Sequence, residues 1–211
     1  MALDTYSGLQ TFLAAQLNRS DLTSNIPDFI TLAESEMQRK LRARVRRDSL
    51  ALTGRVNSMP CAAKELRSIY HTDATTGRRA EIQISTPEEV AAWRVRQGGV
   101  AGRPVIAALT SNGNELIVAP EPDQTYTVEV VYFQALQALS ASNTENDELR
   151  EYPHMYVAGA LKYAENFLEH EEAAATRDAE FQQAIREANT DREHGEYGAN
   201  PRPARLPVVI G

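Results

Sequence analysis

Apolar residues near the start of the chain recur at three- and four-residue spacing, which is the period of an amphipathic helix. The pattern predicts one helix over residues 5–17 and a second helix from about residue 26 to about Arg46. Asn18, Ser20 and Asp21 favour a turn between them, and Pro27 suits the first turn of a helix. The second helix is expected to bury one face, made of Ile26, Ile30, Ala33, Met37, Leu41 and Val45.

After Arg47 the pattern changes to short stretches that alternate in polarity or are rich in β-branched residues. Asn112-Gly113 lies between two of these stretches and is typical of a tight β-hairpin. Thr86-Pro87-Glu88-Glu89 reads as a capping box that begins a short helix, which Gly98-Gly99 would end. Strands are predicted within residues 49–53, 66–70, 79–84, 105–110, 115–119 and 126–133.

The last third of the chain has the helical period again, over residues 153–168 and then over residues 172–192. These two segments are predicted to form an antiparallel helix pair. The whole chain is therefore expected to be α+β, with a helical bundle made from both ends, an inserted antiparallel β lobe and an extended C-terminal arm. The expected domains are 1–48 (helix hairpin), 49–140 (β lobe with one short helix), 141–194 (helix pair) and 195–211 (arm).

Several short motifs also follow one another in a specific order. Asn18 to Glu34 reads N-R-S-D-L-T-x-x-I-P-D-F-I-x-L-A-E, and Gly102-Arg103-Pro104, residues 116–123 and Tyr152-Pro153-His154 come after it. This order resembles the head-to-tail adaptor, or connector, proteins of tailed bacteriophages, and it covers roughly residues 5–195. The segment 144–149 is longer and more acidic than in those proteins, so contacts of that loop cannot be transferred.

The resemblance implies a structural virion protein at the head-tail junction, made in the cytoplasm of a host bacterium. About twelve copies are expected to form a ring beneath the portal protein, to extend the DNA channel and to dock tail or nozzle proteins. Genomic DNA would pass through without sequence-specific binding. The alternative is a non-enzymatic tail-completion or regulatory binding module that uses the basic helix face described next.

Charge is unevenly distributed along the chain, which carries 22 Lys and Arg against 29 Asp and Glu, a net charge of −7. Such a balance argues against a general nucleic-acid binder. Arg39, Arg42 and Arg46 are expected to share one face of the predicted second helix. This face is either solvated and paired with acidic helices of the same chain, or it contacts an acidic neighbouring subunit or DNA.

Residues 195–211, the predicted arm, contain prolines that prevent them from continuing the helix, yet their end is apolar. They are either a frayed tail or a strand that adds to a sheet edge or groove on another subunit. The second interpretation makes them part of a hypothetical subunit or portal interface, whose residues would be Arg39, Arg42, Arg46, Leu206, Val208, Val209 and Ile210.

Motifs that carry chemistry are missing from the sequence. It contains no phosphate-binding loop, no nucleophile elbow and no His-Glu-x-x-His zinc pair. The four histidines are scattered and Cys61 is the single cysteine, so neither a zinc cluster nor an intrachain disulfide is expected. No stretch is long and apolar enough to span a membrane. We therefore predict no enzyme activity, no catalytic, metal or cofactor site, no cofactor and no membrane contact.

Overall fold

The computed structural model of the protein describes residues 3–72 and 78–197, with side chains up to residue 193. The chain divides into two compact units, and the fold class is α+β as predicted. Unit 1 consists of Met1–Arg42 and Ala138–Gly211 and is helical. Unit 2 is the inserted segment Ala43–Gln137 and holds all the strands of the described chain.

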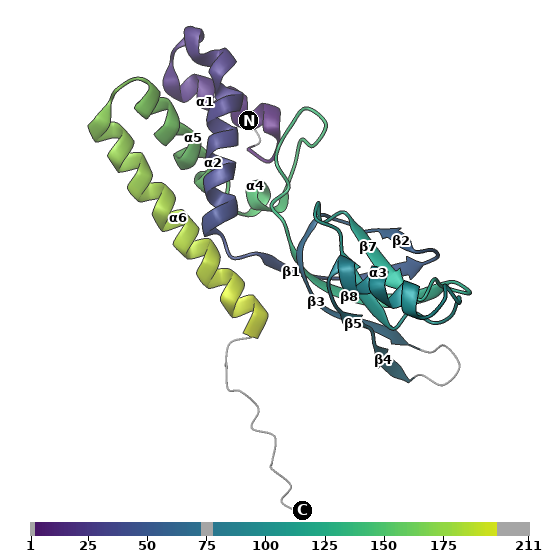
Figure 1. The fold of residues 1–211 in the computed structure, drawn as a ribbon. Helices are drawn as coiled ribbons and strands as arrows, with labels where there is room; N and C mark the ends of the chain where they lie inside the picture. Colours follow the sequence, from purple (N-terminus) through teal and green to yellow (C-terminus); the bar gives the residue numbers. More distant parts are fainter. Residues whose placement is uncertain (1–2, 73–77, 198–211) are drawn as a thin grey trace, which may run out of the picture. The chain divides into compact units, whose positions relative to one another are not determined.

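Unit 1 is a bundle in which helices from the two ends of the chain pack together (Figure 1). Helix α5 contacts α1, α2 and α6, so it is the central member. The turn after α1 is as expected, since Asn18 caps the helix in the left-handed conformation, with φ of 49°. The helices are α1 (Tyr6–Leu17), a short 3-10 helix (Ser20–Asn25), α2 (Ile26–Lys40), α4 (Asp147–Glu151), α5 (Pro153–Phe167) and α6 (Glu171–Tyr197).

Close packing of α5 depends on one glycine. A Cβ atom at Gly159 would lie 2.8 Å from Cε2 of Phe181 on α6 and 2.9 Å from Cβ of Ala33 on α2. Real side chains do not approach so closely, so Gly159 allows the three helices to meet. Around this point the core is filled by fully buried side chains, among them Leu9, Leu13, Ile30, Met37, Met155, Tyr156 and Phe181.

Unit 2 has two four-stranded sheets and one helix. The first sheet has the strand order β1-β8-β3-β4 and the second has the order β2-β7-β6-β5. All pairings are antiparallel except the short parallel pair of β5 with β6. The elements are β1 (Arg44–Leu52), β2 (Val56–Ser58), β3 (Ala63–Thr72), β4 (Arg79–Glu81), β5 (Gln83–Ile84), α3 (Pro87–Arg96), β6 (Ile106–Leu109), β7 (Glu115–Ala119) and β8 (Tyr126–Gln134).

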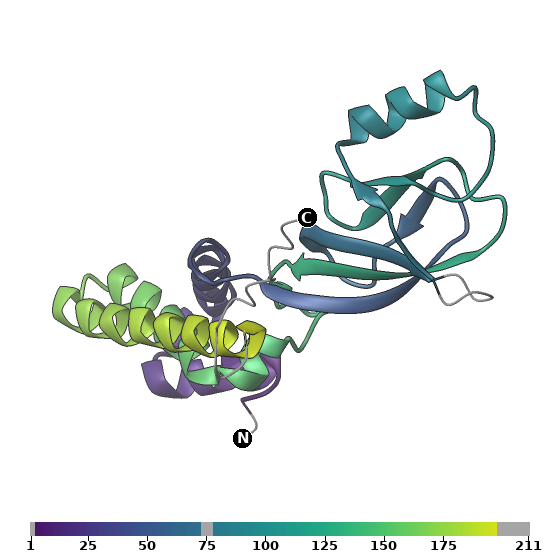
Figure 2. The ribbon, with the colours of Figure 1, turned by 90° about the horizontal axis from the view of Figure 1, so that it is seen from below.

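The two sheets of unit 2 face each other across a common core. Ile69 and Val130 of the first sheet and Leu116 of the second are fully buried in it. Helix α3 covers the other face of the second sheet (Figure 2), where Val90 packs against Ile106 in a separate small core. Unit 2 therefore has three layers, sheet, sheet and helix, each bounded by apolar residues.

Turns and caps of unit 2 agree with the prediction at three places. Strands β6 and β7 form the expected hairpin, and Gly113 in its loop has φ of 73°. A Cβ atom there would lie 2.1 Å from the carbonyl oxygen of Ala63, so only glycine fits. The Thr86 side chain accepts a hydrogen bond from Glu89 N and begins α3. At the other end, Gly98 N and Gly99 N donate to Val95 O and Arg94 O, which is the Schellman pattern.

The predicted extent of the second helix was wrong. Helix α2 ends at Lys40, and Arg44 to Leu52 form strand β1, which pairs with β8 over nine residues. The segment 79–84 was also predicted as one strand, but it divides between the two sheets at the buried Ile82. The segment 144–149, expected to be a loop, contains the start of α4, which Asn146 caps through Leu149 N.

Candidate functional site

Two buried glutamates lie on α2 at the centre of unit 1. Glu34 is 5% exposed and accepts hydrogen bonds from Leu139 N (2.8 Å) and from the Tyr156 hydroxyl (3.0 Å). Burial raises the pKa of the Glu34 carboxyl, against the effect of these two bonds. Asn146 also donates to the Tyr156 hydroxyl (2.6 Å), so the network connects α2 with the start of α4.

Glu36 lies at the centre of a second network, formed with charged and polar side chains. It accepts hydrogen bonds from Lys40 (2.7 Å), Lys162 (2.8 Å), Tyr163 (2.8 Å) and Gln182 (3.0 Å). Burial by itself would raise the pKa of this carboxyl, but the four donors outweigh it and lower the pKa to about 2. The network joins α2, α5 and α6.

Both points where the chain crosses between the units are held by side chains of unit 1. Where the chain leaves, Arg42 N donates to Asn189 Oδ1 (2.7 Å) and Arg192 donates to the Arg42 carbonyl oxygen. Arg192 is only 10% exposed and forms an ion pair with Glu148 (2.7 Å). Where the chain returns, Glu34 holds Leu139 N. These hydrogen bonds hold the chain in place where it leaves unit 1 and where it returns to unit 1.

The predicted basic face does not exist as one face of a helix. Arg39 is on α2, where it donates to Ser35 (3.0 Å), and Arg42 follows the end of that helix. Arg46 is on β1 in unit 2, and its Nε donates to Gln134 Oε1 (2.8 Å). The three arginines are thus divided between the two units, which removes the geometric basis of that hypothesis. The other four predicted interface residues lie outside the described part of the chain: Leu206, Val208, Val209 and Ile210.

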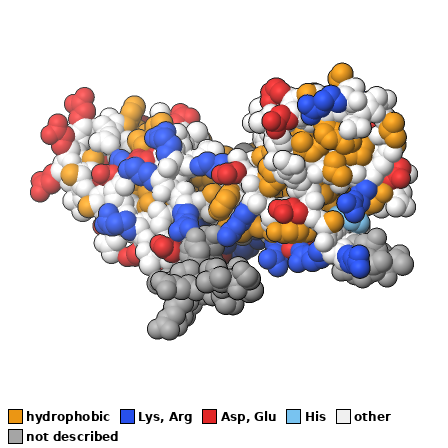
Figure 3. Space-filling model, turned by 60° about the horizontal axis from the view of Figure 1, so that its bottom comes forward, with side chains coloured by type: hydrophobic (Ala, Val, Ile, Leu, Met, Phe, Trp, Pro, Cys, Tyr) orange, Lys and Arg blue, Asp and Glu red, His pale blue; other side chains and the backbone are white. Residues whose placement is uncertain are grey.

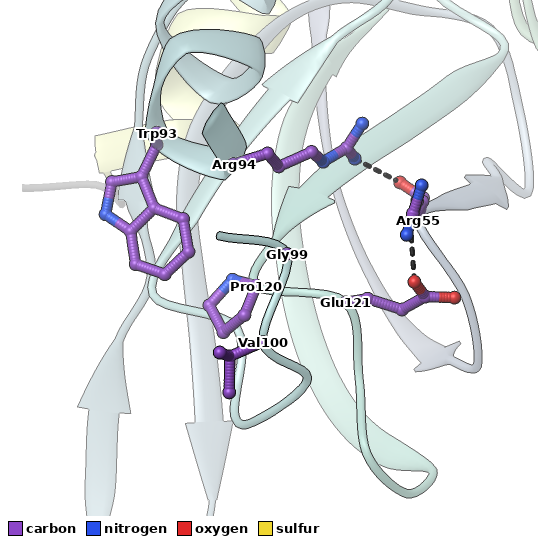
Figure 4. A pocket seen from close by; sticks show the side chains of 7 residues that line it. All are labelled: Arg55, Trp93, Arg94, Gly99, Val100, Pro120 and Glu121. Atoms are coloured by element: carbon purple, nitrogen blue, oxygen red, sulfur yellow. Dashed lines mark hydrogen bonds and ion pairs between the residues drawn. The ribbon is translucent and has the colours of Figure 1, made fainter. Parts of the chain in front are cut away.

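A small pocket in unit 2 lies between α3 and the end of β7. It has a volume of about 80 Å³ and is lined by Trp93, Val100, Pro120 and Gly99 together with charged side chains (Figure 4). Because ligand sites are usually at least several hundred Å³, this pocket suits one side chain better than a nucleotide or sugar. The sequence analysis did not predict this pocket, because the residues that line it come from segments that are separate along the chain.

The charged side of this pocket has two guanidinium groups and one carboxylate. Arg55 pairs with Glu121 (2.5 Å), and Arg94 donates to the carbonyl oxygens of Arg55 (3.2 Å) and Val118 (2.7 Å). The Nε atom of Arg94 is buried and makes no hydrogen bond within the described residues. Burial, followed by the nearby Arg55, lowers the pKa of the Arg94 guanidinium. An additional negative charge at this place would be stabilised.

Large apolar side chains are exposed at a few positions. Unit 2 exposes five of the seven in the described residues, and Val95 and Val100 are the most accessible, at 83% and 70%. Unit 1 exposes Phe167 (59%) and Leu32 (47%). Hydrophobic side chains gather on the face of unit 2 seen in Figure 3. Exposed apolar groups of this kind are typical of surfaces that contact other proteins.

The described residues contain neither a cluster of possible metal ligands nor a helix that could span a bilayer. Within residues 3–72 and 78–197, no three or more His, Cys, Asp or Glu side chains are grouped so as to hold a metal ion. His71, His154 and His170 contact Thr127, Glu187 and Glu165 respectively, at separate places. None of the helices in those ranges is long and apolar enough to cross a bilayer.

Neither unit holds a metal cluster among its described residues, and both units expose apolar side chains there. The sequence matches the SU10 adaptor protein family over residues 4–206, and the chain belongs to this family. It is a family of phage head-tail adaptors, which are structural proteins of the virion, so the resemblance noted in the sequence is confirmed. A comparison with curated proteins gave no match.

Proposed function

We propose that this protein forms a ring of about twelve copies beneath the portal, extends the DNA channel and provides the docking surface for the tail. The observation that supports this most is the family match, which spans residues 4–206 and therefore both units. The proposed mechanism is assembly, without catalysis and without a cofactor. The partners are other copies of the chain, the portal protein, tail or nozzle proteins, and the DNA that passes through.

The charge distribution supports a role beside DNA that does not involve tight binding. Unit 1 carries 11 Lys and Arg against 19 Asp and Glu, whereas unit 2 carries 11 against 10. An acidic wall repels the phosphate backbone, so it keeps DNA from adhering while it moves. We therefore propose that helices of unit 1 line the channel, and that the virion junction is where the protein works.

The proposed portal and subunit contacts involve the segment 200–211 and the arginines considered above. Leu206, Val208, Val209 and Ile210 supply apolar side chains that a sheet edge or groove on a partner would cover. Arg39, Arg42 and Arg46 remain proposed contacts for an acidic neighbour, now as separate groups and no longer as one helical face.

The test is the mass of the complex that forms when the full chain is mixed with the portal protein of the same genome. A parallel mixture contains the chain without residues 200–211. We expect about one adaptor per portal subunit for the full chain and loss of the complex on truncation. As a matched control, the truncated chain should keep the circular dichroism spectrum of the full chain between 208 and 222 nm.

Each other outcome would change a different part of the proposal. Binding that survives truncation would retain the adaptor role and refute the role of residues 200–211. Absence of binding by the full chain would refute the portal proposal and favour a tail-completion or regulatory module. A mass increment far from one adaptor per portal subunit would refute the stoichiometry.

A further inference from the structure

A ring of identical copies needs two different surfaces on each copy that fit each other, because head-to-tail contacts are heterologous. Among the described residues, unit 2 and unit 1 each expose an apolar surface, and the two differ in charge. If the proposed ring forms, these two surfaces can join neighbouring copies, so their assignment rests on the proposed function.

The first surface, the α3 patch, comprises the pocket of unit 2 and the end of α3. Trp93, Val100 and Pro120 form the apolar wall of the pocket, and Arg55 and Arg94 form its charged side (Figure 4). The nearby Val95 and Arg96 are exposed at the last turn of α3. The Schellman turn at Gly98-Gly99 fixes the loop that carries Val100. The α3 patch is therefore an ordered hollow with an apolar wall and an excess of arginine.

The second surface, the Phe167 patch, lies at the end of unit 1 where α5 leads into α6. The Phe167 ring packs on Phe29 of α2, with centroids 5.8 Å apart, yet the side chain is 59% exposed. Leu32 is exposed one turn further along α2, and Asp28 shares its helix face. The turn between α5 and α6 is acidic, since Glu169 lies in it and Glu171 and Glu172 begin α6.

We propose that the α3 patch of one copy binds the Phe167 patch of the next copy, with the Phe167 side chain in the pocket. The pocket has the size for a single side chain, and an exposed aromatic residue is the usual anchor of such a contact. The acidic groups around Phe167 would offset the excess positive charge of the α3 patch, where one carboxylate, Glu121, faces the guanidinium groups of Arg55 and Arg94. A contact between two α3 patches would instead bring arginines together, which disfavours a symmetric dimer.

Single-cysteine variants test this contact directly. In a Cys61→Ala background, Val95→Cys marks the α3 patch and Asn166→Cys marks the Phe167 patch, so that Val100 and Phe167 remain intact. A short bis-maleimide linker is added with the portal protein and without it. We expect covalent dimers when the two variants are mixed, no dimers from either alone, and a ladder of multimers from a chain with both cysteines.

Two further variants make the test specific. Ser49→Cys is exposed on the outer face of the other sheet of unit 2, and its mixture with Asn166→Cys should give no dimers. Phe167→Arg, added to the Asn166→Cys chain, should reduce dimer yield at least about tenfold through lost anchoring and charge repulsion. Because Phe167 is largely exposed, the circular dichroism spectrum should not change.

The proposal is overturned if the mixed variants give no dimers, if Val95→Cys dimerises equally well alone, or if the Ser49→Cys control cross-links to the same extent. The readout is independent of portal binding. Binding of the portal without the expected cross-links would refute only the assigned surfaces, whereas cross-links without portal binding would refute only the portal role.

Discussion

Replacing Glu36 by glutamine removes a buried negative charge on which four side chains of three helices converge. The Glu36 side chain is 8% exposed and accepts from Lys40, Lys162, Tyr163 and Gln182. In the Glu36→Gln variant, Lys162, which is 15% exposed, keeps only the Asp178 carboxylate at 2.7 Å as a charged partner. The variant is nearly isosteric, so its effect on stability comes from charge and hydrogen bonding.

The magnitude follows from the pKa of this carboxyl, which folding lowers from 4.5 to about 2. At about 1.4 kcal/mol per tenfold change in proton affinity, the difference contributes about 3 kcal/mol to the unfolding free energy. Because the folded pKa is depressed, this contribution is complete above pH 4.5 and is lost as pH falls towards 2. By the same relation, about 1.5 kcal/mol remains at pH 3.

The assay is urea denaturation of the full chain and the variant at pH 7 and pH 3, followed by circular dichroism at 222 nm. This signal reports mainly on the helices of unit 1, while the fluorescence of Trp93, the single tryptophan, follows unit 2 in the same sample. We expect the Glu36→Gln substitution to lower the unfolding free energy by about 2–3 kcal/mol at pH 7 and by about half as much at pH 3.

Glu34→Gln is the matched control for this experiment. Burial raises the pKa of Glu34, so ionised Glu34 costs stability at pH 7 and the folded state gains as this group is protonated in acid. Glutamine can still accept from Leu139 N and Tyr156, so we expect a smaller loss than for Glu36→Gln, without the same decrease at pH 3. A loss for Glu36→Gln below about 0.5 kcal/mol, or one equal at both pH values, would refute the reasoning.

Two further predictions concern glycines that lie close to other parts of the chain. Gly113→Ala should destabilise unit 2 by about 2–4 kcal/mol in the Trp93 fluorescence transition, because the new Cβ would meet the Ala63 carbonyl oxygen at 2.1 Å. Gly99→Ala has a similar φ of 74° and open space, so it should cost only about 1–2 kcal/mol, and equal losses would contradict this account. Gly159→Ala should lower the unfolding free energy of unit 1 by about 1–3 kcal/mol, measured from the loss of the helical signal in urea, despite the better helix propensity of alanine. An increase in stability would show instead that α5 can move away from its neighbours.

The elements that could be predicted from sequence are those fixed by local contacts. Thr86 caps α3 by accepting a hydrogen bond from Glu89 N, three residues further along the chain. Asn112-Gly113 turns the chain between the adjacent strands β6 and β7, and the apolar residues of α5 recur with a helical period. In each case the stabilising partner is within a few residues along the chain. The signals that predict these segments are therefore local, although Gly113 and Gly159 also lie against distant parts of the chain.

The first half of strand β1, residues 44–48, could not be predicted because its partner strand is distant in sequence. Leu41 and Val45 continue the spacing of α2, whereas Arg44 pairs with Gln134 and Leu52 with Tyr126. Polar residues occupy core-facing positions of β1, among them Asp48, which accepts a hydrogen bond from the Tyr132 hydroxyl (2.7 Å). The sequence of this half of β1 therefore lacks the alternation of apolar and polar residues that indicates a strand. Nine residues of pairing with β8 outweigh a helical preference.

The buried glutamates had a detectable signal that the sequence prediction did not use. Glu34 follows Ile30 by four residues and precedes Met37 by three, so it lies on the apolar face of α2. A carboxylate there must have partners, although the sequence does not say that they come from Leu139 and Tyr156. The pocket at Trp93 had no comparable signal, because it depends on three segments that meet only in the folded unit.

The insertion of unit 2 into the bundle has a consequence for synthesis on the ribosome. Helices α1 and α2 are made first, but α5 and α6, which cover Ile30 and Met37, emerge more than one hundred residues later. Unit 2 is contiguous, and its first and last strands pair directly, so it can fold as soon as residue 137 has emerged. At this stage of synthesis unit 2 can already be folded, while α5, which packs against the apolar face of α2, and α6 have not yet been made. During this interval the apolar face of α2, with Ile30 and Met37, has not yet been covered by α5.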